Sequence, residues 1–184
     1  MRADEIPVLT TERLRLRAHR LEDFTAFAAM WADPRVTEFI SGRPSTEELS
    51  WARLLRYAGH WALLGFGYWA IEERASGLFA GELGFADYRR AIEPPLDGVP
   101  ELGWILAPAF FGKGYATEAA RAVSAWGDAH FGGRTVCLID PRNVASIRVA
   151  EKCGFHESAR PLYLGEPTIL FERVNSRRAP PSQP

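Results

Sequence analysis

Hydrophobic and polar residues follow two different periods in the first third of the chain. Alternation over residues 13–18, with arginine at every second position, predicts a strand with one solvated face. Apolar residues at helical spacing follow from Asp23 and stop at Asp33, before a proline, which predicts a short helix. A second helix is expected to begin after Ser45 or Thr46 and to continue to about residue 63. Its apolar side would comprise Leu49, Trp51, Leu54, Leu55, Ala58 and Trp61.

Shorter apolar segments with a strand period, interrupted by two further helices, follow in the remaining chain. The expected strands are residues 66–71 and 78–85 as a hairpin, then 101–107, 135–139, a strand from Phe155, and 168–174. Helices are expected from about Tyr115 to His130 and from Asn143 to Cys153, where Gly154 ends the second. The order β-α-α-β-β-β-α-β-α-β-β contains no repeat and predicts a mixed α/β (α+β) fold.

The composition is that of one soluble globular domain. The chain has 184 residues, of which 47% are hydrophobic and 24% charged, so it can bury a sizeable core. We expect residues 1–174 to form a single domain and the proline-rich residues 175–184 to form a flexible tail. The formal net charge of −1 excludes a chain-wide basic field for nucleic acid or anionic lipid.

The location expected from the sequence is the cytoplasm. Residues 61–71 are the most apolar stretch, and they are far shorter than the ~20 residues of a membrane-spanning helix. Two cysteines, Cys137 and Cys153, provide neither a disulfide framework nor a four-ligand zinc site. No signal peptide is visible, so a reducing compartment is the expectation.

The segment after the strand at 101–107 indicates an anion-binding turn. Gly112 and Gly114 flank Lys113, and a helix is expected to begin at once. The first turn of a helix has unpaired N–H groups, and glycine lets a phosphate approach the backbone closely. A Walker loop is excluded because glycine, not serine or threonine, follows Lys113. A dinucleotide-binding turn fits poorly because Thr117 stands at the third glycine position, and a plain strand-to-helix turn is also consistent.

A second motif distinguishes between these interpretations. Residues 143–155, Asn-Val-Ala-Ser-Ile-Arg-Val-Ala-Glu-Lys-Cys-Gly-Phe, come shortly after the strand at 135–139. Together with the Phe-Gly-Lys-Gly-Tyr-Ala turn at residues 111–116, this motif resembles the GNAT superfamily of acetyl-CoA-dependent N-acetyltransferases. The N-terminal segment Leu-Thr-Thr-Glu-Arg-Leu-Arg-Leu-Arg, then Asp23 and Asp-Pro-Arg-Val at 33–36, resembles the RimJ/RimL branch. That branch includes enzymes that acetylate the N-termini of ribosomal proteins, and the resemblance covers roughly residues 8–174.

The resemblance implies a central twisted mixed sheet of about six to seven strands flanked by about four helices. The strand at 101–107 would splay from the strand at 135–139, and the pantetheine arm of acetyl-CoA would fill the gap like an added strand. Acetyl-CoA would be the co-substrate, and no metal is expected. The residues implied to bind CoA are Trp104, Ile105, Leu106, Phe111, Gly112, Lys113, Gly114, Tyr115, Ala116, Thr117, Asn143 and Ser146.

Two positions depart from the family pattern. Phe111 stands where many members have glutamine or arginine, which removes one polar contact to CoA and leaves the amide cradle intact. Ala150 stands where many members have a tyrosine that protonates the departing thiolate. Ser146 lies one helical turn before Ala150 on the same face, so its hydroxyl is the candidate acid. The alternative for Ser146 is a bond back to its own helix, and the alternative for Asn143 is a plain helix cap.

An acceptor amine must lose a proton before it can attack, and a carboxylate or histidine is the natural base. Glu101 is the expected base because it opens the strand beside the acetyl site, on the face that also carries Gly103 and Ile105. The alternative for Glu101 is a solvated strand end. Further candidates are Glu82, Asp87, Asp140 and His156, whereas His19, His60 and His130 are expected to be structural.

The acceptor is expected to lie over the first two helices and the loop at residues 86–100. Glu93 and Asp97 supply negative charge there, which suits a cationic amine or a peptide N-terminus. Core packing is the favoured role for the aromatic residues on the helices. The aromatic residues of this region are Phe39, Trp51, Tyr57, Trp61 and Tyr88.

These observations predict an enzyme that transfers an acetyl group from acetyl-CoA to a primary amine by direct attack. The amine would belong to a small molecule or a protein N-terminus. One alternative is a CoA-binding sensor or regulatory module with little catalysis, because Ala150 replaces the usual acid. A nucleotide or dinucleotide binder is the third hypothesis. No nucleic-acid or membrane partner is expected, and a homodimer is a candidate assembly because members of the branch often dimerise.

Overall fold

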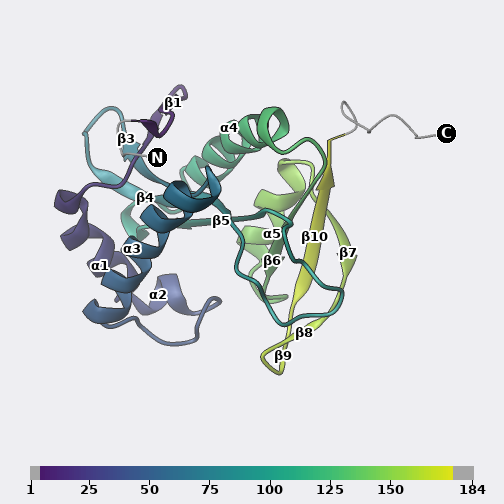
Figure 1. The fold of residues 1–184 in the computed structure, drawn as a ribbon. Coiled ribbons are helices and arrows are strands. Elements are labelled where there is room, and N and C mark those ends of the chain that lie inside the picture. Colours follow the sequence, from purple (N-terminus) through teal and green to yellow (C-terminus); the bar gives the residue numbers. More distant parts are fainter. Residues whose placement is uncertain (1–4, 176–184) are drawn as a thin grey trace.

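A computed structural model of the chain describes residues 5–175, and its central feature is one mixed sheet (Figure 1). Eight strands follow the order β1-β2-β3-β4-β5-β6-β10-β7, and all neighbours are antiparallel except β5 and β6. The strands are β1 (Leu9–Thr10), β2 (Leu14–Arg17), β3 (Tyr68–Glu73), β4 (Phe79–Ala86), β5 (Glu101–Leu106), β6 (Arg134–Ile139), β7 (His156–Ala159) and β10 (Ile169–Val174). β8 (Leu162–Tyr163) and β9 (Glu166–Pro167) form a separate hairpin. The predicted mixed α/β fold is confirmed.

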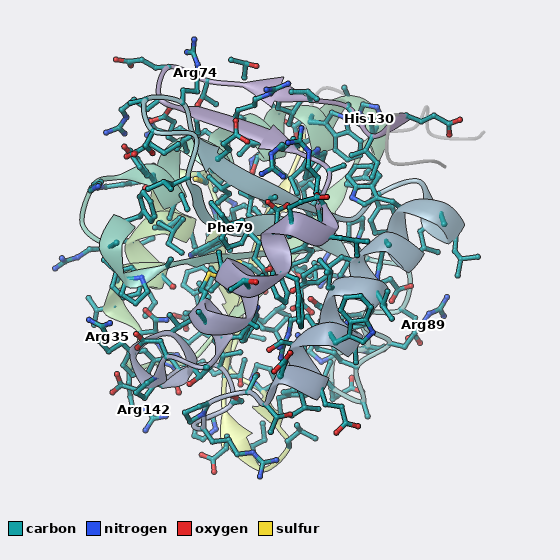
Figure 2. All side chains as sticks on the ribbon, turned by 90° about the vertical axis from the view of Figure 1, so that its left-hand side faces the viewer. Arg35, Arg74, Phe79, Arg89, His130 and Arg142 are labelled. Carbon is teal, nitrogen blue, oxygen red and sulfur yellow. The ribbon has the colours of Figure 1, made fainter. Side chains whose placement is uncertain are left out.

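Helices cover both faces of this sheet. The α-helices are α1 (Phe24–Trp31), α2 (Pro34–Thr37), α3 (Glu47–Leu64), α4 (Tyr115–His130) and α5 (Val144–Lys152), and short 3-10 turns occur at η2 (Leu21–Asp23) and η3 (Pro108–Phe110). In Figure 1, α1, α2 and α3 gather on the left, and α5 lies with β6, β10 and β7 on the right. Figure 2 looks onto α1 and α3 in front of the sheet.

Each face of the sheet has its own hydrophobic core. Under α1 and α3, Phe27, Trp31 and Tyr57 pack on Tyr68 of β3 and Ala86 of β4. On the opposite face, small residues of α4 and α5 pack against β2 to β6. The residues that alternate along β5 divide between the two cores, with Leu102 in the second and Ile105 against the first. The helix cap predicted for α3 is Thr46, whose hydroxyl accepts a hydrogen bond from the Leu49 N–H at 3.2 Å.

The prediction of a solvated arginine face on β2 is wrong at Arg17. This side chain is only 5% exposed, and its guanidinium donates to Asp23 at 2.7 and 2.8 Å and to Glu72 at 2.6 Å. Hydrogen bonds from Arg17 to these carboxylates raise the pKa of its guanidinium above the usual value, against the opposing effect of burial. An arginine can be buried when carboxylates fill its donors, and a period-two pattern does not reveal those partners.

The apolar side predicted for α3 is only partly correct. Leu54 and Trp61 are buried as expected, but Leu49, Trp51 and Leu55 are exposed. Ser50 and Tyr57 complete the buried stripe instead. Apolar residues occupy more than half of the circumference of this helix, so spacing alone does not decide which side faces the sheet.

The first residue of the predicted tail, Asn175, is hydrogen-bonded to the domain. The N–H of Asn175 donates to the Gly133 carbonyl at 3.0 Å, and its side-chain amide donates to the Asp128 carbonyl at 3.1 Å. Asn175 is therefore attached to the domain. The other residues of the predicted tail, 176–184, lie outside the described residues.

Candidate functional site

The parallel strands β5 and β6 meet at one point and then separate. Within residues 5–175 their register contains a single pair, Glu101 with Val136, supported by a hydrogen bond from the Val136 N–H to the Pro100 carbonyl at 3.1 Å. β5 remains paired with β4 over its whole length. Residues 103–106 are consequently half-buried although they lie in the middle of the sheet. The predicted splay is confirmed, and it leaves main-chain groups along one edge of β5 for a ligand.

The glycine turn lies at the end of this opening. After β5 the chain passes through η3 and then turns at Gly112 and Gly114, with φ of 73° and 80°. Both values lie in the left-handed region, which explains why glycine occupies these positions. α4 begins directly after Gly114, so the N–H groups of its first turn have no partner within the helix. A Cβ built on Gly112 would meet no atom within 4 Å, so the backbone there is open to a ligand.

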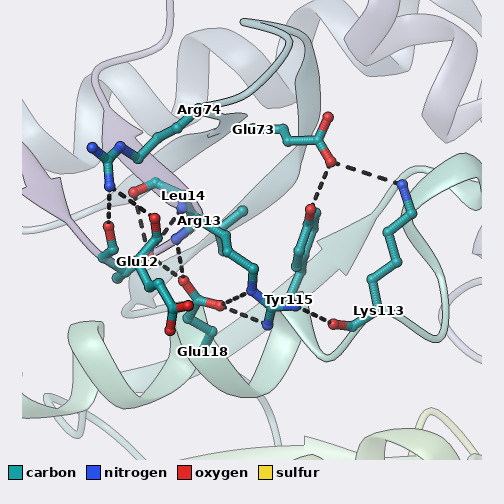
Figure 3. A network of polar contacts seen from close by, with 9 residues as sticks. Glu12, Arg13, Leu14, Glu73, Arg74, Lys113, Tyr115 and Glu118 are labelled. Carbon is teal, nitrogen blue, oxygen red and sulfur yellow. Dashed lines mark hydrogen bonds and ion pairs between the residues drawn. The ribbon is translucent and has the colours of Figure 1, made fainter.

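A network of ion pairs fixes this turn to β2 and β3 (Figure 3). Glu118 in the first turn of α4 accepts from Thr11 at 2.6 Å and from Arg13 at 2.7 Å, and Arg13 also donates to the Lys113 carbonyl at 2.9 Å. Glu73 at the end of β3 accepts from the Tyr115 hydroxyl at 2.6 Å, and its carboxylate lies 3.7 Å from the Lys113 ammonium. The sequence pattern had not indicated these partners, because they are about 40 to 107 residues apart in the chain.

The charges of this network also affect its own carboxylates. Hydrogen bonds from Ser76 and Tyr115, followed by the Lys113 charge, lower the pKa of Glu73. Burial raises the pKa of Glu118, but hydrogen bonds from Thr11 and Arg13 outweigh it and leave the pKa lowered. Both groups therefore stay ionised at neutral pH. An open groove continues from the turn and is lined by Thr11, Glu12, Arg13, Gly114, Thr117, Glu118, Arg121, Ala122 and Lys152.

The motif at residues 143–155 contains α5 and its N-cap residue Asn143, and α5 packs beside β6. The Asn143 side-chain oxygen accepts a hydrogen bond from the Ser146 N–H at 3.0 Å, so Asn143 has the helix-cap role given as its alternative. The side-chain NH2 of Asn143 remains a second, independent donor group. Ser146 is half-buried, and Ala150 one turn later is fully buried in the core between α4, α5 and the sheet. A tyrosine at position 150 would have no room without repacking this core.

Glu101 lies where β5 and β6 are still paired. It is 8% exposed, and its two carboxylate oxygens accept hydrogen bonds from Arg90 at 2.6 and 2.7 Å. Arg90 in turn lies over the rings of Tyr88 and Tyr163. Glu101 is therefore not a solvated strand end, and the base role predicted for it stays a prediction.

The other side chains considered as bases, three carboxylates and one histidine, lie in different environments. Asp87 and Asp140 form ion pairs with exposed arginines two residues later in the chain. His156 is exposed on β7, the strand at the edge of the sheet. Glu82 is fully buried on β4, with Ile105 of β5 as its cross-strand partner.

No group of three or more histidine, cysteine, aspartate or glutamate side chains within residues 5–175 is arranged to hold a metal ion. None of the helices in this part of the chain is long and apolar enough to cross a bilayer.

An opened sheet that ends at a glycine turn before a helix has the free main-chain groups that a ligand with a phosphate end and an amide-bearing arm needs. Comparison with known proteins agrees with this class of site. A family model for the acetyltransferase (GNAT) domain matches residues 13–156. The uncharacterised protein YkkB of Bacillus subtilis strain 168 is 36% identical over 172 residues, which are 90% of this chain and 94% of YkkB.

Solved structures of acetyltransferases are also similar to this chain. A structure from Bordetella pertussis, assigned to the GNAT family of acetyltransferases, is 34% identical and superposes with a TM-score of 0.80 over 91% of this chain and 99% of that one. RimL, an α-N-acetyltransferase of ribosomal protein L7/L12, was solved with coenzyme A and shares the fold at 18% identity. Its TM-score is 0.73, over 91% of this chain and 98% of RimL. The chain belongs to the GNAT acetyltransferase family, and it is an acyltransferase of that type.

Proposed function

We propose that this protein transfers an acetyl group from acetyl-CoA to a primary amine by direct attack of the amine on the thioester. The observation that carries the proposal is the opening between β5 and β6, which runs from Glu101 to the glycine turn at Gly112. Membership of the GNAT family supports acetyl transfer in general. The assignment to the RimJ/RimL branch remains part of the proposal.

Acetyl-CoA fits the residues that surround this opening. Its pyrophosphate would accept hydrogen bonds from the N–H groups of residues 112–116, and its amide-bearing arm would pair with the main chain of residues 104–106. Phe111, Thr117 and the Asn143 NH2 group would border the same path. The open space at Gly112 supports close approach of the phosphates to the backbone.

The transfer itself needs few protein groups. The acceptor nitrogen attacks the thioester carbonyl carbon, a C–N bond forms, and the C–S bond then breaks. A main-chain N–H of β5 would stabilise the tetrahedral oxyanion. The Ser146 hydroxyl would donate to the departing thiolate, whose low basicity lets a weak donor suffice.

The acceptor would approach from the side of α1 and α3. Small-molecule amines and protein N-termini are both candidates, and RimL, which acts on a protein N-terminus, shares the fold. The amine screen should therefore contain spermidine, an aminoglycoside, free amino acids and short peptides with a free N-terminus.

Thermal unfolding with saturating acetyl-CoA tests the donor site, with ATP and NADH as controls. A ligand at about 100 times its Kd should stabilise the fold by ~2.7 kcal/mol, a shift of a few degrees in Tm. Stabilisation by acetyl-CoA together with turnover of an amine supports the proposal. Stabilisation without turnover of any amine favours the CoA-binding sensor instead, and a larger shift with NADH overturns the donor site.

A matched pair of glycine variants locates this binding in the turn. Gly112 and Gly77 have φ of 73° and 72°, and a Cβ at either one would meet no atom within 4 Å. Each change to alanine should cost about 1–2 kcal/mol through backbone strain alone. Gly112→Ala should also weaken acetyl-CoA binding, whereas Gly77→Ala in the β3–β4 hairpin should leave it unchanged. Equal acetyl-CoA affinity in the two variants would contradict the pyrophosphate site.

A further inference from the structure

Glu82 is a fully buried carboxylate one strand away from the opening. Its cross-strand partner is Ile105, so its side chain lies on the face of the sheet that α1 and α3 cover. Oxygen Oε1 accepts hydrogen bonds from the Tyr57 hydroxyl at 2.6 Å and the Trp31 indole N–H at 3.3 Å. Oxygen Oε2 is buried and has no hydrogen-bond partner among the described residues. A buried acceptor without a partner costs stability, so its presence needs a reason beyond packing.

A cluster of tyrosines extends from Glu82 to the start of the opening. The rings of Tyr57 and Tyr68 stack with centroids 4.4 Å apart. The Tyr68 hydroxyl lies over Gly103, only 2.0 Å from where a Cβ would stand. It accepts a hydrogen bond from the Tyr88 hydroxyl at 3.3 Å. Gly103 is two residues beyond Glu101, the β5 residue that pairs with β6, so this cluster reaches the place where the thioester would lie.

The surroundings of Glu82 allow it to change protonation near neutral pH. Burial raises its pKa to about 7, against the hydrogen bond from Tyr57 and the charges of Arg53 and Arg56 on α3. The other groups that face it are Trp31 of α1 and Tyr68 of β3. Burial raises the pKa of Tyr57 and Tyr68 well above the usual value, so both hydroxyls stay neutral. The Tyr57 hydroxyl is hydrogen-bonded to Glu82, and the Tyr68 hydroxyl is hydrogen-bonded to Tyr88.

Glu101, in contrast, is paired with an arginine through both of its oxygens. Both of its carboxylate oxygens accept hydrogen bonds from Arg90, while Glu82 has no ion pair within residues 5–175 and its Oε2 has no hydrogen-bond partner there. A base that must take up a proton and release it in each cycle works best when its pKa lies near the working pH. This contrast favours Glu82 over Glu101 for that role.

We propose that Glu82 receives the proton which the acceptor amine must lose, through the Tyr57 hydroxyl that is hydrogen-bonded to it and the Tyr68 hydroxyl, with one water bridging the two hydroxyls. This inference rests on the proposed acetyl transfer. The ammonium form R–NH3+ gives one proton to the Glu82 carboxylate, and the free amine then forms the C–N bond. When the C–S bond breaks, the second proton of the nitrogen goes to the thiolate and gives the CoA thiol. Glu82 returns its proton to solvent before the next turnover.

The test compares Glu82→Gln with the matched variant Glu101→Gln. The acceptor is the best amine of the screen with a pKa above about 9, the range of a lysine-type amine, so that its own titration is separate. The wild-type rate should rise with pH and level off above about pH 7. Glu82→Gln should lower kcat about 10²-fold at pH 7. The rate of this variant should keep rising as the pH approaches the pKa of the amine. The Tm shift that acetyl-CoA causes should be the same as in wild type.

Further variants separate a proton acceptor from a merely structural residue. Glu82→Asp should regain an inflection at a shifted pH, and Glu101→Gln should keep the wild-type inflection. An inflection that persists in Glu82→Gln, or disappears in Glu101→Gln, overturns the assignment of Glu82. If wild-type protein acetylates no amine at all, the proposed acetyl transfer fails, and this outcome is distinct from an active enzyme that ignores Glu82.

A stability measurement checks the titration of Glu82 without any acceptor. Folded protein holds the Glu82 proton up to about pH 7, whereas unfolded chain releases it near pH 4.5. Wild-type protein should therefore lose stability relative to Glu82→Gln as the pH rises from 4.5 to 7. A constant difference between the two proteins over this range shows that Glu82 does not titrate there and overturns the proposal.

Discussion

The Tyr68 hydroxyl lies directly over the α-carbon of Gly103, so that a methyl group on this carbon would come within 2.0 Å of the oxygen. Tyr68 is on β3 and Gly103 is on β5, and the intervening strand β4 has Gly84 paired with both of them. Two glycines in neighbouring strands thus provide the space in which a buried tyrosine hydroxyl reaches the opened part of the sheet. The absence of a side chain at position 103 therefore matters both for packing of the sheet and for the position of the Tyr68 hydroxyl at the candidate site.

The first prediction concerns this contact. Gly103→Ala should lower the free energy of unfolding by about 1–3 kcal/mol because the new methyl group overlaps the hydroxyl. Tyr68→Phe removes the hydroxyl and leaves the nearest ring carbon at 3.2 Å from the methyl position. The double variant should therefore be more stable than Gly103→Ala alone. Denaturant unfolding of wild type, the two single variants and the double variant measures this difference. Strictly additive effects of the two changes would show that the contact does not exist in solution.

The second prediction separates the two roles of Asn143. Asn143→Ala removes the cap of α5 and should cost about 0.5–2 kcal/mol of stability. Asn143→Asp keeps the oxygen that accepts from Ser146 but loses the NH2 group, so stability should be retained while acetyl-CoA binds more weakly. Thermal unfolding and calorimetric titration measure the two quantities. Unchanged acetyl-CoA affinity in Asn143→Asp would reduce Asn143 to a cap.

The third prediction concerns the thiolate. Ser146→Ala should lower kcat with the amine acceptor and leave Tm near that of wild type, because the helix cap uses the Ser146 N–H and not its hydroxyl. Val144→Ala, at an exposed position of the same helix, is the control for changes in helix propensity. A kcat equal to that of the control would mean that the thiolate leaves without help from Ser146.

The fourth prediction is a pH dependence of stability caused by His19. Burial lowers the pKa of this imidazole to about 4, and both ring nitrogens lack hydrogen-bond partners among the described residues. Unfolded chain binds the proton near pH 6.5, so stability should fall by about 3 kcal/mol as the pH decreases from 6.5 to 4. His19→Phe should lack this part of the slope. Parallel stability curves for the two proteins over that range would contradict a buried neutral His19.

The fifth prediction tests the buried ion pair of Arg17. Asp23→Ala leaves the guanidinium of Arg17 buried with Glu72 as its remaining carboxylate, and it should cost about 3–5 kcal/mol. Asp33→Ala removes the aspartate that pairs with the exposed Arg35 and caps α2, and it should cost about 0.5–2 kcal/mol. Chemical denaturation of both variants gives the comparison. Similar losses would show that burial adds nothing to the Arg17–Asp23 pair.

Local pattern predicted most of the elements that form the proposed donor site. The helix expected from Tyr115 to His130 has these bounds in the structure, and the strand expected at 101–107 ends one residue earlier. These segments carry strong local signals: glycines at left-handed positions, a proline stop, and an asparagine that caps α5. Such signals act over a few residues, so they are readable from the sequence without knowledge of the partners.

The sequence by itself determined the glycine turn, the Asn143 cap and the order of the elements along the chain. Tertiary structure alone decided which charged side chains are buried and which groups form hydrogen bonds and ion pairs with them. Arg17 looked solvated because its partners Asp23 and Glu72 come from other elements, and Glu82 looked like one lesser candidate among several. The protonation of a carboxylate depends on burial and on groups that folding brings within a few ångströms. Those distances exist only after the sheet and the helices have packed.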